Sequence, residues 1–135
     1  MTEISGKVAF VTGAASGIGA AIAKRFCDEG VNVLAVDLNE ISWAEQYETV
    51  TPVQLDVTSE SLGEVIIKNI NHHFGGGCDI LVNAAGISVV SPFDDPDSAV
   101  WDKTIAINLD AVTLLTRAVL PFLKDSDQGR IIMIG

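Results

Sequence analysis

Residues 12–19 read Thr-Gly-Ala-Ala-Ser-Gly-Ile-Gly and join a short β-rich run, Lys7–Val11, to a helical segment that ends near Glu29. Glycines at such a junction let the backbone turn tightly and approach a ligand without interference from Cβ atoms. The free amides in the first turn of the helix, together with the helix dipole, attract a diphosphate even in an acidic protein. The turn therefore predicts a strand–turn–helix site for a dinucleotide, with contacts from Gly13, Ala15, Ser16, Gly17, Ile18 and Gly19.

An acidic residue, Asp37, ends the next apolar run, Val31–Asp37. The intervening helix, Ile18–Glu29, runs back by about 18 Å, and the strand then covers about 23 Å in the opposite direction. Asp37 therefore returns to the glycine turn, close to the roughly 20-residue offset expected for an acid that binds a ribose. Its carboxylate would accept hydrogen bonds from ribose hydroxyls and repel a 2′-phosphate, and the next residue is Leu38 rather than a cation. These features predict NAD rather than NADP as the cofactor; the alternative is a solvated aspartate at a strand end.

Strand and helix patterns alternate along the chain, which predicts one α/β domain, residues 1–135, with a Rossmann-like, doubly wound parallel sheet. The hydrophobic share of 48% fits a sheet buried on both faces. We expect five strands in the order 3-2-1-4-5, at Lys7–Val11, Val31–Val36, Val53–Val57, Cys78–Val82 and Arg130–Ile134. We expect helices at Gly17–Glu29, with an apolar stripe of Ile18, Ile22 and Phe26, and at Glu40–Tyr47, which is short and weak. A third helix is expected from a Ser61–Glu64 capping box to a break at Gly75–Gly77. Two more are expected, one from about Ser98 and one at Asn108–Lys124.

Composition excludes several kinds of partner. The net charge of −10 argues against nucleic acid, because a phosphate backbone attracts basic surfaces. The polar amino terminus, Met1–Lys7, has no signal-peptide core, and no apolar run approaches the ~20 residues that span a bilayer, so we expect no membrane contact.

Cys27 and Cys78 are expected to be buried free thiols in a reducing compartment, and the expected location is the cytoplasm. His72-His73 and Cys78 are too few and too irregularly spaced for a metal site, so no metal is expected.

Four motifs, including the turn, resemble those of the short-chain dehydrogenase/reductase family. Glycines 13, 17 and 19 give the pattern T-G-x-x-x-G-x-G. Asp56-Val57 resembles the family's adenine contact, and Asn83-Ala84-Ala85-Gly86 resembles its N-N-A-G motif with alanine at the second asparagine. Ile107-Asn108-Leu109 resembles the motif whose asparagine helps to hold a water in the proton relay.

The resemblance implies an NAD(H)-dependent oxidoreductase that interconverts a secondary alcohol and a ketone. It implies that Asp37, Leu38, Asp56, Val57 and the Asn83–Gly86 segment contact the cofactor, and that the Asn83–Gly86 segment also braces the central sheet. It further implies that Asn108 belongs to the catalytic machinery. It also implies a homo-oligomer formed through the 108–124 helix.

The resemblance covers the amino-terminal part of such an enzyme. The family's chemistry uses a serine just after strand five and a Y-x-x-x-K motif, and these 135 residues contain neither; the only tyrosine is Tyr47, with Thr51 at the lysine position. We therefore expect a domain truncated before strand six that binds cofactor without catalysing turnover. Two other functions stay open: a non-catalytic NAD-binding module, and a fragment completed by another chain. The sequence also leaves open which alcohol or ketone the parent enzyme uses.

Overall fold

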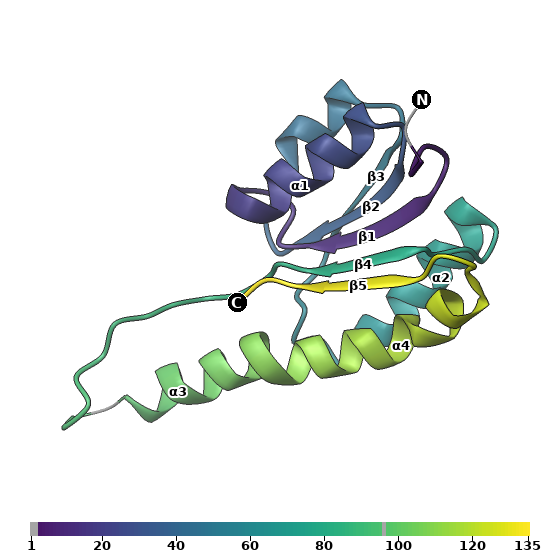
Figure 1. The fold of residues 1–135 in the computed structure, drawn as a ribbon. Helices are drawn as coiled ribbons and strands as arrows, with labels where there is room; N and C mark the ends of the chain where they lie inside the picture. Colours follow the sequence, from purple (N-terminus) through teal and green to yellow (C-terminus); the bar gives the residue numbers. More distant parts are fainter. Residues whose placement is uncertain (1–2, 96) are drawn as a thin grey trace.

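Five parallel strands form one sheet in the order β3-β2-β1-β4-β5 (Figure 1). The computed structural model describes residues 3–95 and 97–135, so residue 96 and the first two residues of the expected polar amino terminus lie outside it. The strands are β1 (Val8–Thr12), β2 (Asn32–Asp37), β3 (Val50–Gln54), β4 (Ile80–Asn83) and β5 (Arg130–Met133). The helices are α1 (Gly17–Asp28), α2 (Leu62–Phe74), α3 (Ser98–Ile105) and α4 (Ala111–Asp125), with a 3₁₀ segment η1 (Ser42–Gln46) and a π-helical turn η2 (Ala106–Asp110). The predicted Rossmann-like fold and strand order are confirmed.

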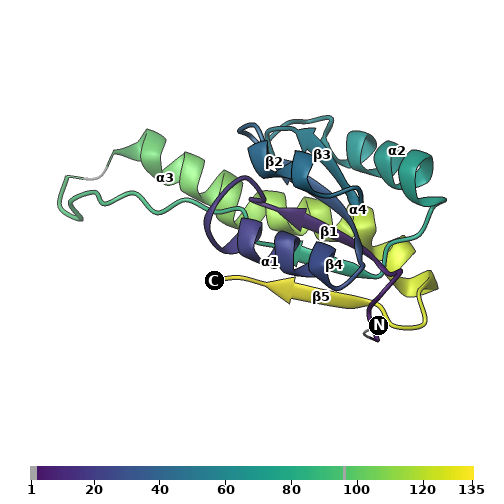
Figure 2. The same ribbon diagram turned by 90° about the horizontal axis from the view of Figure 1, so that it is seen from above.

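Helices cover both faces of the sheet (Figure 2). On one face, α1 and η1 pack on the strands in a cluster that includes Val11, Ala23 and Trp43. On the other face, α2 and α4 pack in a second cluster that includes Phe10 and Ile66. Neighbouring residues of a strand point to opposite faces, which is why Phe10 and Val11 enter different cores. The sheet is therefore doubly wound, as predicted.

Small side chains bring α1 onto the sheet. The buried residues of α1 are Gly19, Ala20, Ala23 and Cys27. Of the predicted stripe, Ile22 and Phe26 pack only partly buried against this core, and Ile18 is 61% exposed. The prediction was therefore wrong for Ile18, because short side chains on the inner face let the helix approach the strands closely and turn the larger ones outward.

Strand β3 comprises Val50–Gln54 and begins earlier than the predicted Val53–Val57. In the parallel pairing of the two strands, Val50 lies beside Val33 of β2 and Gln54 lies beside Asp37. The two strands therefore end at the same level. Pro52 is tolerated because β3 lies at the edge of the sheet. The chain from Leu55 to Val57 then crosses toward α2.

Two other local predictions were also wrong. The predicted helix Glu40–Tyr47 is only the single 3₁₀ segment η1. The Ser61 side chain makes no capping hydrogen bond, because its hydroxyl lies 3.0 Å from that of Ser59 instead. The predicted capping box is therefore absent.

The predicted helix Asn108–Lys124 is part of a longer one, Ser98–Asp125, in which α3, η2 and α4 are continuous. Asn108 lies within the π-helical turn and does not begin the helix. By length and composition alone this helix could cross a membrane, contrary to the expectation that no segment approaches that length. Length and composition are weak evidence for a membrane-spanning helix, because α4 packs on the sheet and on α2. Its buried residues there are Ala111, Leu115, Val119 and Leu123.

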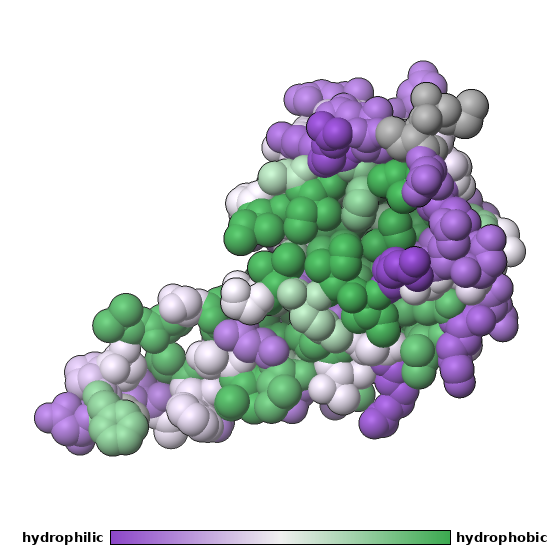
Figure 3. Space-filling model, in the orientation of Figure 1, coloured by the Kyte–Doolittle hydropathy of each residue, from purple (hydrophilic) through white to green (hydrophobic). Residues whose placement is uncertain are grey.

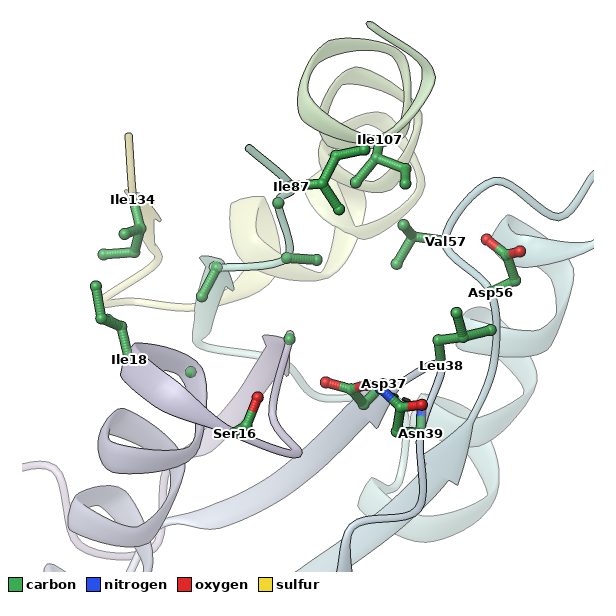
Figure 4. A pocket seen from close by; sticks show the side chains of 15 residues that line it. Ser16, Ile18, Asp37, Leu38, Asn39, Asp56, Val57, Ile87, Ile107 and Ile134 are labelled. Atoms are coloured by element: carbon green, nitrogen blue, oxygen red, sulfur yellow. Dashed lines mark hydrogen bonds between the residues drawn. The ribbon is translucent and has the colours of Figure 1, made fainter. Parts of the chain in front are cut away.

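The face of β5 on the side of α1 is apolar and partly exposed. Ile132 pairs with Val82, which belongs to the cluster beneath α1, so Ile132 and Ile134 point to that face. Both are 38% exposed. Apolar side chains gather on this side of the molecule, between α1 and the strands (Figure 3). This surface adjoins the mouth of a cleft, where Ile134 lies opposite Ile18 (Figure 4).

Candidate functional site

A cleft of about 370 Å³ lies at the carboxyl ends of the central strands (Figure 4). From β1 the chain connects to β2 on one side, and from β3 it crosses to β4 on the other, so the strand order reverses here. Open α/β sheets bind their ligands at this kind of switch point. The volume falls within the roughly 300–1,000 Å³ of small-molecule sites. The cleft is lined by Gly13, Ser16, Ile18, Gly19, Asp37, Leu38, Asn39, Asp56, Val57, Ala84, Ala85, Gly86, Ile87, Ile107 and Ile134.

The glycine turn forms the floor of the cleft and has no room for side chains at two positions. A Cβ atom on Gly13 would lie 2.9 Å from the backbone of Ala84 and Ala85, and Gly13 has a φ of +66°. A Cβ atom on Gly19 would collide with the carbonyl oxygen of Gly13. Gly17 also has a positive φ, +57°, but faces open space. The turn is therefore built from backbone that a ligand can approach closely.

The backbone amides of the turn divide into two groups. Ala14 N–H donates to the carbonyl of Val36 at 3.2 Å, and Ala15 N–H donates to Asp37 Oδ2 at 2.9 Å. Among the described residues, the next four amides, residues 16–19, have no backbone or side-chain acceptor. Ser16 is the N-cap of α1, yet its side chain makes no capping bond. The start of α1 therefore offers unpaired donors and a positive dipole end, which suit a diphosphate.

Asp37 lies at the end of β2, on the wall of the cleft next to the turn. Its Oδ2 accepts from Ala15 N–H and its Oδ1 accepts from Asn39 N–H, both at 2.9 Å. Each carboxylate oxygen has two acceptor sites, so both can take a further hydrogen bond from a ligand hydroxyl. Leu38 is 60% exposed, and no lysine or arginine stands among the cleft-lining residues that the structure describes.

Asp56 and Val57 lie across the cleft from the turn, on the segment between β3 and α2. Thr58 donates to Asp56 Oδ1 from its backbone amide at 2.8 Å and from its hydroxyl at 2.7 Å. These hydrogen bonds hold the pKa of Asp56 below its usual value. Asp56 is therefore an oriented carboxylate at neutral pH, and its second oxygen is left to accept from a ligand amino group.

Thr12 joins the glycine turn to the segment after β4. Its hydroxyl, on a side chain that is 1% exposed, accepts from Ala84 N–H at 3.1 Å and from Ala85 N–H at 3.0 Å. Asn83, in contrast, is directed away from the cleft: its amide donates to Thr116 Oγ1 and to Met133 Sδ, both at 3.3 Å. Asn83 therefore braces β4 against α4 and β5.

We expect Thr12→Val to lower the free energy of unfolding by about 2 kcal/mol, because the isosteric change leaves two partly buried amides without an acceptor. Thr12→Ser keeps the hydroxyl and should stay within about 1 kcal/mol of the unmodified protein, since it loses one methyl group. Urea denaturation measures both differences. Equal stabilities of the two variants would show that the hydroxyl is not what joins these segments.

Asn108 lies beside the cleft and not in it. From the π-helical turn its Oδ1 accepts from Ile87 N–H at 2.9 Å, and its Nδ2 donates to the Ile87 carbonyl at 2.8 Å. These two hydrogen bonds fix the backbone of Ile87, just after Gly86. Asn108 also lies close to Gly86 itself, since a Cβ atom on Gly86 would be 3.3 Å from Asn108 Oδ1. Asn108 therefore sets the position of the wall formed by Ile87 and Ile107.

The structure brings most of the predicted site residues together in one cleft, although they come from four separate stretches of chain. The exceptions are Ala15, Gly17, Asn83 and Asn108, which do not line it. The sequence prediction missed Asn39, Ile87, Ile107 and Ile134, which also line it. Ile87, Ile107 and Asn39 are next to or near predicted residues and could have been included; Ile134 has no such signal, because only the pairing of β5 with β4 brings it to Ile18.

Known proteins resemble this chain in both sequence and fold. The family model described as short chain dehydrogenase matches residues 7–135. An uncharacterized oxidoreductase of Staphylococcus epidermidis is 39% identical over 141 residues, which cover 100% of this chain and 60% of that protein. The D-beta-hydroxybutyrate dehydrogenase of Cupriavidus necator is 38% identical over 98% of this chain and 54% of its own length. The ligand-free structure of Thermoplasma acidophilum aldohexose dehydrogenase superimposes with a TM-score of 0.89 at 29% identity, covering 98% of this chain and 50% of that one. The chain thus spans about half to three fifths of the proteins it matches.

Proposed function

This chain belongs to the short chain dehydrogenase family, and on that premise we propose that it binds NAD in the cleft at the carboxyl ends of β1, β2 and β4. For the whole protein we propose NAD(H)-dependent interconversion of a secondary alcohol and a ketone. The name of one relative supports this substrate class, because it denotes a dehydrogenase of D-beta-hydroxybutyrate, which carries a secondary alcohol.

The position of Asp37 is the observation that supports NAD rather than NADP as the cofactor. Its carboxylate lies in the cleft beside the glycine turn, where the ribose of a bound dinucleotide would lie if its diphosphate occupied the unpaired amides of residues 16–19. A 2′-phosphate at that ribose would meet a carboxylate, with no described lysine or arginine on the cleft wall to offset the repulsion. The geometry therefore favours a cofactor with a free 2′-hydroxyl.

The other cleft residues divide between the two ends of the cofactor. At the adenine end, Leu38 and Val57 would contact the ring faces, and the free oxygen of Asp56 would accept from the exocyclic amino group. At the nicotinamide end, Ile18 and the Ala84–Gly86 backbone would contact the second ribose and the ring. When bound, NAD would supply the hydride acceptor. Asn108, through its hold on Ile87, would keep the wall on the substrate side in place.

We propose that residues 1–135 suffice for cofactor binding and do not by themselves turn over an alcohol, because they contain no Tyr-x-x-x-Lys.

We also propose that the whole protein contacts a second copy of itself through the continuous helix. Three exposed leucines on this helix support the contact: Leu109, Leu114 and Leu120. The cytoplasmic location stays a prediction.

Isothermal titration of the purified protein with NAD tests the binding proposal. We expect saturable binding of one NAD per chain, and binding of ADP-ribose, which keeps the diphosphate and the Asp37-facing ribose. Absence of saturable binding at millimolar NAD would contradict the proposal. The activity is tested on the whole protein by following NADH absorbance with a panel of secondary alcohols; binding without turnover of any of them would favour a non-catalytic NAD-binding module instead.

A further inference from the structure

Trp43 makes an unexpected contact with the glycine turn. It lies in η1, outside the family motifs, and its side chain is 5% exposed. Its indole Nε1–H donates a hydrogen bond of 2.8 Å to the carbonyl oxygen of Ala14, a residue that is itself fully buried. A buried indole N–H needs an acceptor, and here that acceptor is the backbone of the turn.

The indole ring is held in place by contacts on more than one side. Tyr47 packs edge-on to it, with ring centroids 5.9 Å apart. Lys24 Nζ, from α1, lies 5.6 Å from the ring centroid. The ring also belongs to the core cluster formed by α1, β1 and β2. Because these contacts fix the orientation of the ring, they also fix the direction in which its N–H points.

Trp43 and Asp37 act on the same peptide group. The peptide that joins Ala14 to Ala15 has its carbonyl oxygen bound by Trp43 Nε1–H and its N–H bound by Asp37 Oδ2. A peptide group is planar, so hydrogen bonds at its two opposite ends fix its rotation as well as its position. The unpaired amides of residues 16–19 follow directly after this peptide, and their direction depends on it.

We propose that Trp43 is a positioning residue for the diphosphate of the bound dinucleotide, acting through the Ala14 carbonyl. It holds the first half of the turn so that the amides of the second half converge on one point. This inference rests on the proposed function, because it assumes that a dinucleotide diphosphate binds at the turn.

The test is Trp43→Phe, which keeps an aromatic ring in the core and removes the N–H donor. Trp101→Phe is the matched control, since Trp101 is 65% exposed on α3. Without this bond the turn has to be ordered when the ligand binds, and the cost of that ordering is about that of one buried hydrogen bond, or about tenfold in affinity. We therefore expect Trp43→Phe to bind ADP-ribose and NAD about tenfold more weakly, by isothermal titration. We expect its affinity for adenosine, which has no diphosphate, to be unchanged, and we expect Trp101→Phe to behave like the unmodified protein with all three ligands.

A merely structural role for Trp43 would give a different result. Equal losses of adenosine and ADP-ribose affinity, or no loss of either, would overturn the inference. The proposed function would survive both outcomes, because it fails only if the unmodified protein does not bind NAD.

A second measurement covers the case in which Trp43→Phe does not fold. In the unmodified protein, with the Trp101 signal assigned by Trp101→Phe, the Trp43 indole N–H resonance should shift on addition of ADP-ribose and not of adenosine. An indole signal that does not respond to saturating ADP-ribose would overturn the inference.

Discussion

Gly19→Ala is expected to weaken NAD binding by about a hundredfold. A Cβ atom at position 19 would collide with the Gly13 carbonyl oxygen. Gly13 has little room to move aside, because a Cβ atom on it would come within 2.9 Å of the backbone of Ala84 and Ala85. Overpacking of this kind costs about 1–3 kcal/mol or more, and 2.7 kcal/mol corresponds to about a hundredfold in affinity. The strain would fall on the turn whose amides are to bind the diphosphate.

Gly17→Ala is the matched control. Gly17 has a φ of +57°, but a Cβ atom there meets nothing within 4 Å. The substitution therefore costs only the left-handed strain of a non-glycine residue, about 1–2 kcal/mol. Isothermal titration with NAD compares the two variants, and circular dichroism shows whether each is folded. If Gly19→Ala bound NAD as tightly as Gly17→Ala, the close packing of the turn would not be what the cofactor site requires.

The sequence could predict the features that depend on local backbone chemistry. The glycine turn has to lie between strand and helix, and the lengths of α1 and β2 return Asp37 to it, so both follow from elementary geometry. The order of the strands follows from the alternation of elements and is confirmed. The exact extent of β3 could not be predicted, because Val50–Gln54 contains Pro52 and the alternative Val53–Val57 has the better strand pattern; only pairing with β2 decides between them.

Contacts between distant segments could not be predicted from the sequence. Nothing in the run from Ser42 to Gln46 indicates that the Trp43 indole reaches the Ala14 carbonyl, since that depends on how η1 packs against α1. Asn108 was assigned a role from its motif, but the bidentate contact with Ile87 requires the π-helical turn, which no periodicity reveals. The resemblance implies both bracing of the sheet and cofactor contact for the Asn83–Gly86 segment, but it does not say which residue does which; the Asn83 side chain points toward α4 and β5.

Asp37→Ala is expected to remove most of the preference for NAD over NADP. In the unmodified protein the carboxylate would accept from the ribose hydroxyls and repel a 2′-phosphate, and we expect NAD to bind at least about tenfold more tightly. A hydrogen bond to a charged group is worth about 1.5–3 kcal/mol. Its loss should therefore lower the affinity for NAD by about ten- to a hundredfold. NADP has no 2′-hydroxyl to donate to Asp37, so it loses less hydrogen bonding than NAD and is relieved of the repulsion.

Asp37 has a charge that acts on the cofactor and an oxygen that accepts from the glycine turn. Comparing Asp37→Ala with Asp37→Asn separates these two effects. Alanine removes the acceptor for Ala15 N–H as well as the charge, so Asp37→Ala should loosen the turn and weaken both dinucleotides to some degree. Asparagine can still accept from Ala15 N–H through its amide oxygen but carries no charge. Asp37→Asn should therefore bind NADP better than Asp37→Ala does, with the turn intact and the repulsion gone. Competition titrations with NAD and NADP on the three proteins measure this order. Equal affinities of the unmodified protein for the two cofactors would refute the role given to Asp37, because a carboxylate this close to the turn could not then be facing the ribose.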